Sequence, residues 1–330
     1  MSIVEINDLR KSYGKNVALK GVNISIEEGM IYGLLGPNGS GKSTMINILS
    51  GLIGFDQGSC KIMGIDIKKD KKLIQKTIGV VPQEYSIYDD LKAKENIAFF
   101  GKLYGVNRQI IKTRVDEALN FVDLIQYKNA FPDSFSGGMK RRLNIACSLV
   151  HRPKLLIMDE PTASLDPISR ETVLETVRKL NSNGCTIIYT SHYLDEIEEL
   201  CHRATIINKG QVISEGTPNE IKNSIQNRSK ISLVLFKQFV NIERELESFI
   251  IQNNISNKNY TNVDISNTNI VGYRNENTKK LEIECDNPAK VLELLLQYFK
   301  AKNIIVKDIE ITKMSLDDAF LKLIPKNSKN

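Results

Sequence analysis

The chain has 330 residues, 41% hydrophobic and 25% charged, which is ordinary for a globular protein and long enough for two domains. No apolar run approaches the roughly 18 residues that span a bilayer, and Met1 to Glu5 is not expected to be a signal peptide. The five cysteines are scattered without C-x-x-C spacing, which indicates a reduced cytosolic compartment and no cysteine metal site. The net charge of +6 does not decide the partner, because Lys68–Lys72 is the densest basic block.

Residues 3–28 alternate apolar and polar side chains, which predicts an antiparallel strand pair. Tyr13 lies in the turn expected between the strands. An isolated tyrosine there would be read as a surface aromatic. Because a phosphate-binding pattern follows, we predict instead that its ring stacks on adenine.

The segment Gly36-Pro37-Asn38-Gly39-Ser40-Gly41-Lys42-Ser43 fits G-x-x-x-x-G-K-[ST], a loop whose backbone N–H groups cradle phosphates. The apolar run Met30–Leu35 before it predicts a buried strand, and the residues from Ser43 to Leu49 predict a helix that ends near Gly51. Lys42 would contact the β- and γ-phosphates, and the Ser43 hydroxyl would bind Mg²⁺.

The middle of the chain begins with a predicted strand, Ile78–Val81, followed by Gln83. Gln83 is either a polar surface residue or a ligand that reaches the metal or the attacking water. From Tyr88 to about Val150 the pattern is helical, with apolar residues at helical spacing in 91–104 and 110–122.

A further helix is predicted to begin at Ser136 as N-cap and to end before Pro153. Gly137 and Gly138 in its first turn cost helix stability. One interpretation is an ordinary capped helix; the interpretation we favour is that the backbone approaches an anionic ligand closely at this helix N-terminus.

Two predicted strands end in residues suited to catalysis. Leu155–Asp159 runs into Glu160, and ligands of a parallel sheet gather at the carboxyl ends of its strands. Asp159 is predicted to hold Mg²⁺, and Glu160 to orient and deprotonate a water molecule. The strand 186–191 ends at His192, placed to hydrogen-bond a γ-phosphate, although a lone histidine is more often structural.

The rest of this region is predicted from local signals. Asp166 and Pro167 cap a helix that continues to Leu180. A hairpin follows over 204–214, and Thr217 with Glu220 matches a capping box that opens a short helix.

Taken together, these motifs resemble those of ATP-binding cassette (ABC) ATPases over residues 1 to about 222. They stand in the family's order as Walker A loop, Q-loop, signature motif, Walker B strand, D-loop and switch histidine: Gly36–Thr44, Gln83, Ser136–Gly138, Asp159–Thr162, Ser164–Asp166 and His192. The resemblance implies an α/β P-loop domain with a RecA-like core, an antiparallel β subdomain and a helical subdomain (about 88–150). It also implies ATP and Mg²⁺ as ligands, including contacts from Thr44. Two copies would pair head to tail, with ATP between the Walker A loop of one and Ser136, Gly137 and Gly138 of the other, and Asp166 would communicate between the sites.

The chain departs from the family pattern without losing a phosphate or metal ligand. Met139 stands where Gln is usual, Phe135 where Leu is usual, Ser164 where Gly is usual and Cys147 where Arg is frequent. We therefore expect hydrolysis to survive at an altered rate. The stretches 136–142, 189–193 and 315–321 are similar to those of drug- and antibiotic-resistance exporters of the type-two bacterial group.

Residues 228–330 are predicted to form a separate domain, since the composition becomes rich in Asn beyond Lys222. Strands at 231–236, 270–274, 281–285 and 304–311 alternate with helices at 239–251 and 288–300. This βαββαβ order is typical of a ferredoxin-like fold. A last helix starts at Ser315, with Asp318 completing a capping box. This domain carries no catalytic constellation, and dimer support or regulation is the role we expect.

The function expected from these observations is an ATPase subunit that energises export through a separate membrane permease, peripheral on the cytoplasmic face of the membrane. Its docking surface would lie near residues 84–110, and no nucleic acid is expected as partner. The alternative is a soluble ABC ATPase acting on nucleic acid or ribosomes, but such proteins usually carry two cassettes or a long coiled coil. A simple P-loop kinase or GTPase would not explain Ser136–Gly138.

Overall fold

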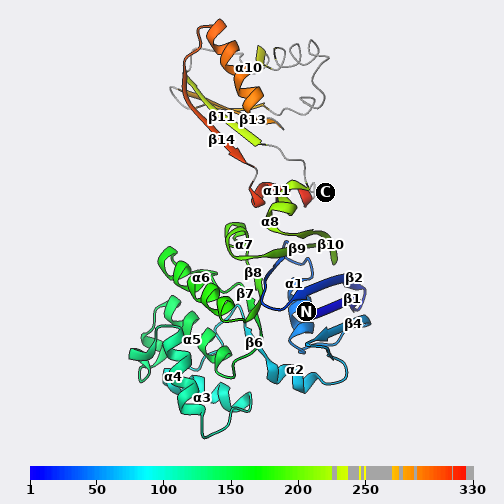
Figure 1. The fold of residues 1–330 in the computed structure, drawn as a ribbon, viewed down its shortest axis with the longest axis vertical. Coiled ribbons are helices and arrows are strands. Elements are labelled where there is room, and N and C mark those ends of the chain that lie inside the picture. Colours follow the sequence, from blue (N-terminus) through cyan, green and yellow to red (C-terminus); the bar gives the residue numbers. More distant parts are fainter. Residues whose placement is uncertain are drawn as a thin grey trace. The chain divides into compact units, whose positions relative to one another are not determined.

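The computed structural model describes residues 1–224, 229–236, 245–246, 249, 270–274, 278–285, 288–313 and 315–324. The chain divides into two compact units, Met1–Asn219 and Glu220–Asn330 (Figure 1). Among the helices in these described ranges, none is long and apolar enough to cross a membrane.

The first unit contains an antiparallel sheet in the order β2-β1-β4-β5. Its strands are β1 (Ser2–Tyr13), β2 (Asn16–Glu27), β4 (Gln57–Ile62) and β5 (Ile65–Asp66). Alternate side chains enter the core, as in the buried pairs Ile6 with Ile24 and Val4 with Ile26. This alternation is what the sequence shows, and the strand pair predicted for residues 3–28 is confirmed.

The second sheet of this unit carries the site and has the order β10-β9-β3-β8-β7-β6. Its strands are β3 (Ile31–Leu35), β6 (Ile78–Val81), β7 (Leu155–Asp159), β8 (Thr186–Thr190), β9 (Arg203–Asn208) and β10 (Gln211–Gly216). All neighbouring pairs are parallel except β9 with β10. Every residue of β3 and β8 is buried, as in sheets covered on both faces. The carboxyl ends of β3, β7 and β8 therefore meet at one edge.

The helices of this unit largely follow the predicted ranges. They are α1 (Lys42–Leu49), α2 (Lys71–Thr77), α3 (Ala93–Leu103), α4 (Ile111–Phe121), α5 (Gly137–Leu149), α6 (Pro167–Ser182) and α7 (Leu194–Leu200), and α8 (Pro218–Asn223) follows at the junction with the second unit. The sequence patterns did not predict α2 and α7, which have seven residues each. The sequence around α2 is a run of charged residues without a clear apolar pattern. Its N-cap is Asp70, whose side chain accepts a hydrogen bond from Leu73 N. The signal for α7 was readable, since Leu194, Ile197 and Leu200 recur at helical spacing and are buried.

The second unit contains a four-stranded antiparallel sheet in the order β12-β13-β11-β14. Its elements are β11 (Ser229–Phe236), β12 (Ile270–Arg274), β13 (Thr278–Cys285), α10 (Pro288–Ala301), β14 (Val306–Lys313) and α11 (Leu316–Leu323). The first and third strands are central, which is the ferredoxin-like arrangement. Apolar residues of β11, β13 and α10 form one core: Ile231, Leu233, Leu281, Ile283, Val291 and Leu295.

Two local predictions in this unit have different outcomes. The capping box before α11 is confirmed, because Ser315 N donates to Asp318 Oδ2 and Asp318 N donates to Ser315 Oγ, both at 3.1 Å. The helix predicted at 239–251 and the polar stretch at 253–269 lie outside the described residues, apart from helical residues at 245, 246 and 249.

Candidate active site

The predicted phosphate loop opens onto a cleft of about 690 Å³ at the carboxyl ends of β3, β7 and β8. The residues that line it come from the antiparallel sheet, the loop after β3, the start of α1, and the segments that follow β6, β7, β8 and β9: Tyr13, Asn16, Val17, Ala18, Lys20, Asn38, Gly39, Gly41, Lys42, Ser43, Thr44, Gln83, Asp159, Glu160, His192 and Lys209. An open α/β sheet binds its ligands at this edge.

The glycines of the loop are required by its backbone. Gly39 and Gly41 have φ values of +76° and +114°, which side chains disfavour. At Gly36 a Cβ atom would lie 2.2 Å from the carbonyl oxygen of Ile207 on the neighbouring strand. The loop therefore curls tightly against β9 and leads directly into α1, whose positive dipole end faces the cleft.

Lys42 lies almost buried at the base of this loop. Its Nζ donates to the carbonyl oxygens of Gly36 at 2.6 Å and Pro37 at 3.3 Å. Burial lowers the pKa of Lys42, while the nearby carboxylates of Glu160 and Asp159 raise it. The side chain is thus a partly desolvated cation aimed along the loop, suited to a phosphate.

The strand β7 delivers both predicted carboxylates to the cleft. Thr190 on the adjacent strand connects them, because its Oγ1 donates to Asp159 Oδ1 at 2.7 Å and accepts from Glu160 N at 2.9 Å. Glu160 has a left-handed backbone conformation with φ of +49°. Such a conformation costs energy in a non-glycine residue and recurs at functional sites.

Glu160 contacts both of the other polar residues predicted for catalysis. Its Oε1 lies 2.6 Å from His192 Nε2, and its Oε2 accepts a hydrogen bond from Gln83 Nε2 at 3.2 Å. These residues follow β7, β8 and β6, so they are far apart in the sequence and the sheet brings them together. This contact favours Gln83 as a residue of the site, although its side chain is exposed, and its role with the metal or the attacking water stays a prediction.

Arg141, which the sequence patterns did not single out, holds the segment around Gln83 in place. The buried guanidinium donates from Nη1 to Pro82 O at 2.8 Å and from Nη2 to Gln83 O at 2.7 Å, and it lies 4.9 Å from the ring centroid of Tyr85. Burial lowers the pKa of Arg141. The helix that begins with Ser136 is therefore tied to the backbone of Gln83.

The residues around Ser136 are placed differently from the rest of the predicted site. Ser136 is the N-cap of α5, as predicted, and its Oγ accepts from Met139 N at 3.2 Å. Ser136, Gly137, Gly138 and Asp166 do not line the cleft of their own chain. Asp166 is the N-cap of α6.

Packing within the chain gives an additional reason for one of the two glycines at the start of α5. A Cβ at Gly138 would lie 2.4 Å from Ser169 Oγ and 2.6 Å from Ser169 Cβ, so the close packing of α5 on α6 already requires glycine at this position. At Gly137 a Cβ would have only ordinary contacts, 3.4 Å from the Tyr85 hydroxyl at the nearest. Packing therefore explains glycine at position 138 without excluding a ligand there, and close approach of a ligand to the backbone at Gly137 and Gly138 stays a prediction.

Tyr13 lies at the rim of the cleft, with half of its surface exposed, and Lys11 Nζ lies 5.4 Å from its ring centroid. An exposed flat ring beside the phosphate loop is suited to stacking, which stays a prediction. The sequence patterns missed the neighbouring residues of β2 (Asn16, Val17, Ala18 and Lys20) and Lys209. No local motif marks them, because only the packing of β2 and of the β9–β10 turn brings them to the loop.

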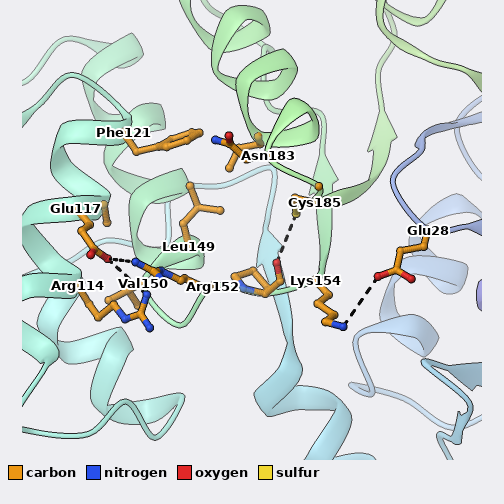
Figure 2. A pocket seen from close by; sticks show the side chains of 14 residues that line it. Glu28, Arg114, Glu117, Phe121, Leu149, Val150, Arg152, Lys154, Asn183 and Cys185 are labelled. Carbon is orange, nitrogen blue, oxygen red and sulfur yellow. Dashed lines mark hydrogen bonds and ion pairs between the residues drawn. The ribbon is translucent and has the colours of Figure 1, made fainter.

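A second cleft, of about 600 Å³, lies at the opposite edge of the sheet, where Lys154 precedes β7 and Cys185 precedes β8 (Figure 2). Charged residues at its rim are paired with each other: Arg152 with Glu117 at 2.7 Å and Lys154 with Glu28 at 4.0 Å. This edge carries the amino ends of the strands, where an open α/β sheet does not place its ligand.

The residues of the first cleft fit a nucleotide and a divalent cation. Ser40 Oγ is buried without a hydrogen-bond partner in the loop, and no atom beyond Gly39 and its two chain neighbours lies within 4 Å of the Cβ position of Gly39, so the loop is open on that side. The Ser43 hydroxyl and the Asp159 carboxylate are oxygen ligands of the kind that Mg²⁺ prefers. The described residues include no cluster of three or more His, Cys, Asp or Glu side chains that could hold a metal by themselves.

Comparisons with known proteins identify the family of the chain. Residues 19–163 match the family model described as ABC transporter. The chain is 37% identical to the linearmycin resistance ATP-binding protein LnrL of Bacillus subtilis, over 97% of this chain and 98% of that protein. It is 32% identical to the daunorubicin/doxorubicin resistance ATP-binding protein DrrA of Streptomyces peucetius, over 97% of this chain and 92% of that protein. A Nod factor export ATP-binding protein I of Rhizobium etli is 36% identical over 67% of this chain and 70% of its own length.

Solved structures show the same fold. The protein cbiO1 from Clostridium perfringens, part of the ABC transporter complex cbiONQ, has a TM-score of 0.63 and 30% identity, covering 67% of this chain and 90% of its own. The ATP-binding cassette MJ0796, in a dimeric post-hydrolysis state bound to ADP and Pi, has a TM-score of 0.59 and 30% identity, covering 65% of this chain and 98% of its own. From its sequence, its fold and its site, the chain belongs to the ABC transporter family, as a nucleotide-binding subunit and an ATPase.

Proposed function

We propose that this ATPase energises the export of a drug, an antibiotic or a lipid-like compound through a separate membrane permease. The relatives that span nearly the whole chain are named for resistance to linearmycin and to daunorubicin and doxorubicin, and a third is named for Nod factor export. Removal of a toxic compound from the cell would produce such resistance. The same names disfavour the alternative, an ATPase acting on nucleic acid or ribosomes.

The contact of Glu160 with His192 and Gln83, in the cleft that holds Lys42, is the observation that carries the mechanism. Glu160 takes the proton of the attacking water as that water adds to the γ-phosphate. His192 holds the γ-phosphate and the orientation of Glu160, and Gln83 orients the water or the metal. Lys42 and the backbone N–H groups of the loop bind the β- and γ-phosphates, and Tyr13 stacks on the adenine.

A magnesium ion would be held by Ser43, Asp159 and Gln83. When bound, it would neutralise phosphate charge that develops in the transition state. Asp159 is suited to this role because Thr190 occupies one of its oxygens and so fixes the carboxylate.

We further propose that two copies of the chain share two ATP molecules. Ser136, Gly137 and Gly138 lie at a helix N-terminus that takes no part in their own chain's cleft, which suits binding to the ATP of a partner. Asp166 would then communicate between the two sites. The dimeric state of the similar cassette bound to ADP and Pi supports this arrangement.

Location and domain roles follow from the transport function. The subunit would lie peripherally on the cytoplasmic face of the membrane, docked on a permease through residues near 84–110, with Gln83 relaying the nucleotide state. Residues 1–222 would be the ATPase domain, and 228–330 would support or regulate the dimer.

The decisive experiment is Glu160→Gln, which preserves shape and removes the base. We expect ATP affinity within about threefold of wild type, turnover lowered at least about hundredfold, and a closed dimer that accumulates with ATP. The matched control is Glu28→Gln, the same change at a half-exposed carboxylate in the other cleft. Wild-type turnover in Glu160→Gln would overturn the mechanism. Co-purification with RNA rather than with a membrane protein would overturn the transport function.

A further inference from the structure

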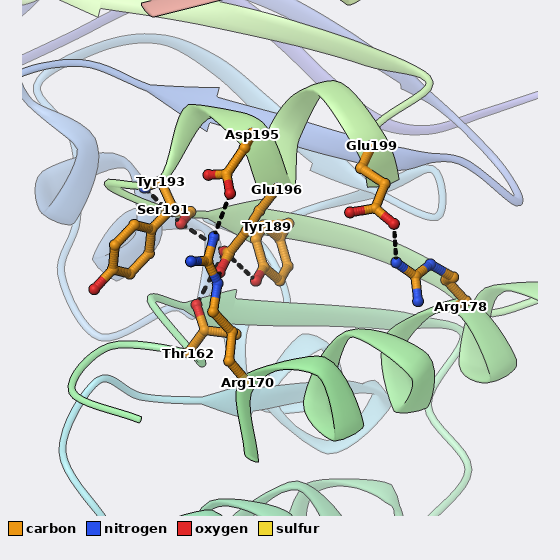
Figure 3. Close-up of polar contacts among 9 residues, drawn as sticks. All are labelled: Thr162, Arg170, Arg178, Tyr189, Ser191, Tyr193, Asp195, Glu196 and Glu199. Atoms are coloured by element: carbon orange, nitrogen blue, oxygen red, sulfur yellow. Dashed lines mark hydrogen bonds and ion pairs between the residues drawn. The ribbon is translucent and has the colours of Figure 1, made fainter. Parts of the chain in front are cut away.

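A fully buried carboxylate contacts the segments that carry Glu160 and His192. Glu196, in the first turn of α7, has no exposed side-chain surface. An ionised group in such a position is tolerated only when it is paired and fully hydrogen-bonded. Figure 3 shows side chains from several segments of the chain that converge on it.

Both oxygens of Glu196 accept short hydrogen bonds. Oε2 accepts from Tyr189 OH and Ser191 Oγ, each at 2.7 Å, and from Thr162 Oγ1 at 2.9 Å. Oε1 accepts from Arg170 Nε at 2.6 Å, and the same guanidinium also pairs with Asp195 at 2.8 Å. Bonds to a charged acceptor in a buried site are among the stronger ones in proteins.

Three of the four donors belong to segments that carry predicted site residues, two of them catalytic. Thr162 lies two positions after Glu160, and Ser191 immediately precedes His192. Arg170 lies in the first turns of α6 and its N–H donates to the carbonyl oxygen of Asp166, the N-cap of that helix. One carboxylate therefore connects the segment after β7, the segment after β8 and the start of α6.

The remaining contacts show that connecting these three segments is more than a general attachment of α6 to α7. The fourth donor, Tyr189, lies within β8 itself, one residue before its end, and belongs to none of the three segments. A second ionic connection between α6 and α7 exists on the surface, where Arg178 pairs with Glu199 and with Glu171. The ion pair of Arg178 with Glu199 contacts neither the segment after β7 nor the segment after β8. Attaching α6 to α7 therefore does not by itself require a buried glutamate.

We propose that Glu196 is a positioning residue for ATP hydrolysis, which sets the distance between Glu160 and His192 and fixes the start of the Asp166 helix relative to both. This inference rests on the proposed function of Glu160. Glu196 does not contact the reacting atoms. It acts by holding Thr162 and Ser191 on the same oxygen, so that the segments on which Glu160 and His192 lie cannot shift independently.

The test removes the donors one at a time and leaves Glu196 in place. Thr162→Val keeps the shape of a buried residue and deletes one hydroxyl, Ser191→Ala deletes another, and Tyr189→Phe deletes a third from the same oxygen. We expect kcat to fall at least about tenfold in Thr162→Val and Ser191→Ala, with KM for ATP within about twofold of wild type. Tyr189→Phe should keep kcat within about twofold, although it loses an equally short hydrogen bond.

Two further variants separate positioning from loss of stability. Thr162→Ser restores the hydroxyl and should recover most of the kcat lost in Thr162→Val. Arg170→Gln should lower kcat more than Arg178→Gln, which breaks only the surface connection. The thermal midpoint of every variant is measured beside kcat. A kcat loss that follows the midpoint across all variants, or a Tyr189→Phe variant as slow as Thr162→Val, would overturn the positioning role.

The result also distinguishes this inference from the proposed function. If Glu160→Gln abolishes turnover but Thr162→Val is as fast as wild type, the positioning role alone is wrong. If Glu160→Gln retains turnover, the mechanism on which the positioning role depends is wrong.

Discussion

The surroundings of His151 lead us to expect that the folded protein loses stability in mild acid. Its ring lies just beyond α5, stacked on Tyr104 with centroids 3.8 Å apart, and its Nε2 lies 3.1 Å from Ile78 O at the start of β6. Its Nδ1 is buried without a partner. Burial lowers the pKa of His151 from 6.5 to about 4, although the contact with Ile78 O raises it. His151 therefore binds a proton more weakly in the folded protein than in the unfolded chain.

The sign and size of the effect follow from these two pKa values. Between the unfolded pKa of 6.5 and the folded pKa of about 4, the unfolded state binds more protons, so stability is fully present above 6.5 and is lost as the pH falls toward 4. Linkage between about pH 7 and about pH 5 gives a loss of about 2 kcal/mol from this residue, or roughly 20-fold in the folding equilibrium.

The assay is chemical unfolding followed by far-UV circular dichroism, because the chain has no tryptophan. His151→Gln retains a donor for Ile78 O without titrating in this range, and His151→Phe retains a ring beside Tyr104. Both variants should lose about 2 kcal/mol less than wild type between about pH 7 and about pH 5, whatever their stability at neutral pH. Parallel pH profiles for wild type and both variants would refute the reasoning.

Three further outcomes are expected. Lys42→Ala should weaken ATP binding about a hundredfold in fluorescent-nucleotide titration, because charge-assisted bonds to phosphate are lost; unchanged affinity would contradict the assigned role. Gly138→Ala should lower stability by about 1–3 kcal/mol in thermal unfolding, since the new Cβ would lie 2.4 Å from Ser169 Oγ, and Ser169→Gly should recover part of that loss. Asp166→Ala should cost about 1 kcal/mol by removing the acceptor for the N–H groups of Ile168 and Ser169, whereas Asp166→Asn should keep the cap. If Asp166→Asn hydrolyses ATP at the wild-type rate, the carboxylate charge has no role in communication between sites.

Local signals in the sequence were sufficient for most of the secondary structure. Ser136, Asp166 and Ser315 each cap the helix that was predicted to follow, because a cap bonds to backbone N–H groups only two or three residues away. The strands β3, β7 and β8 were recognisable as short apolar runs, since both faces of a parallel sheet are buried. Short elements without a clear pattern, such as α2, could not be found in this way.

The sequence by itself determined which residue types follow the strands, with Lys42 at the start of α1 after β3, Glu160 after β7 and His192 after β8, because each motif is a short run of neighbouring residues. Only the tertiary structure decided that Glu160 touches both His192 and Gln83, and that Arg141 and Glu196 hold the segments on which these residues lie. Most of these contacts join residues separated by tens of positions, and they depend on how strands and helices pack rather than on any short-range preference.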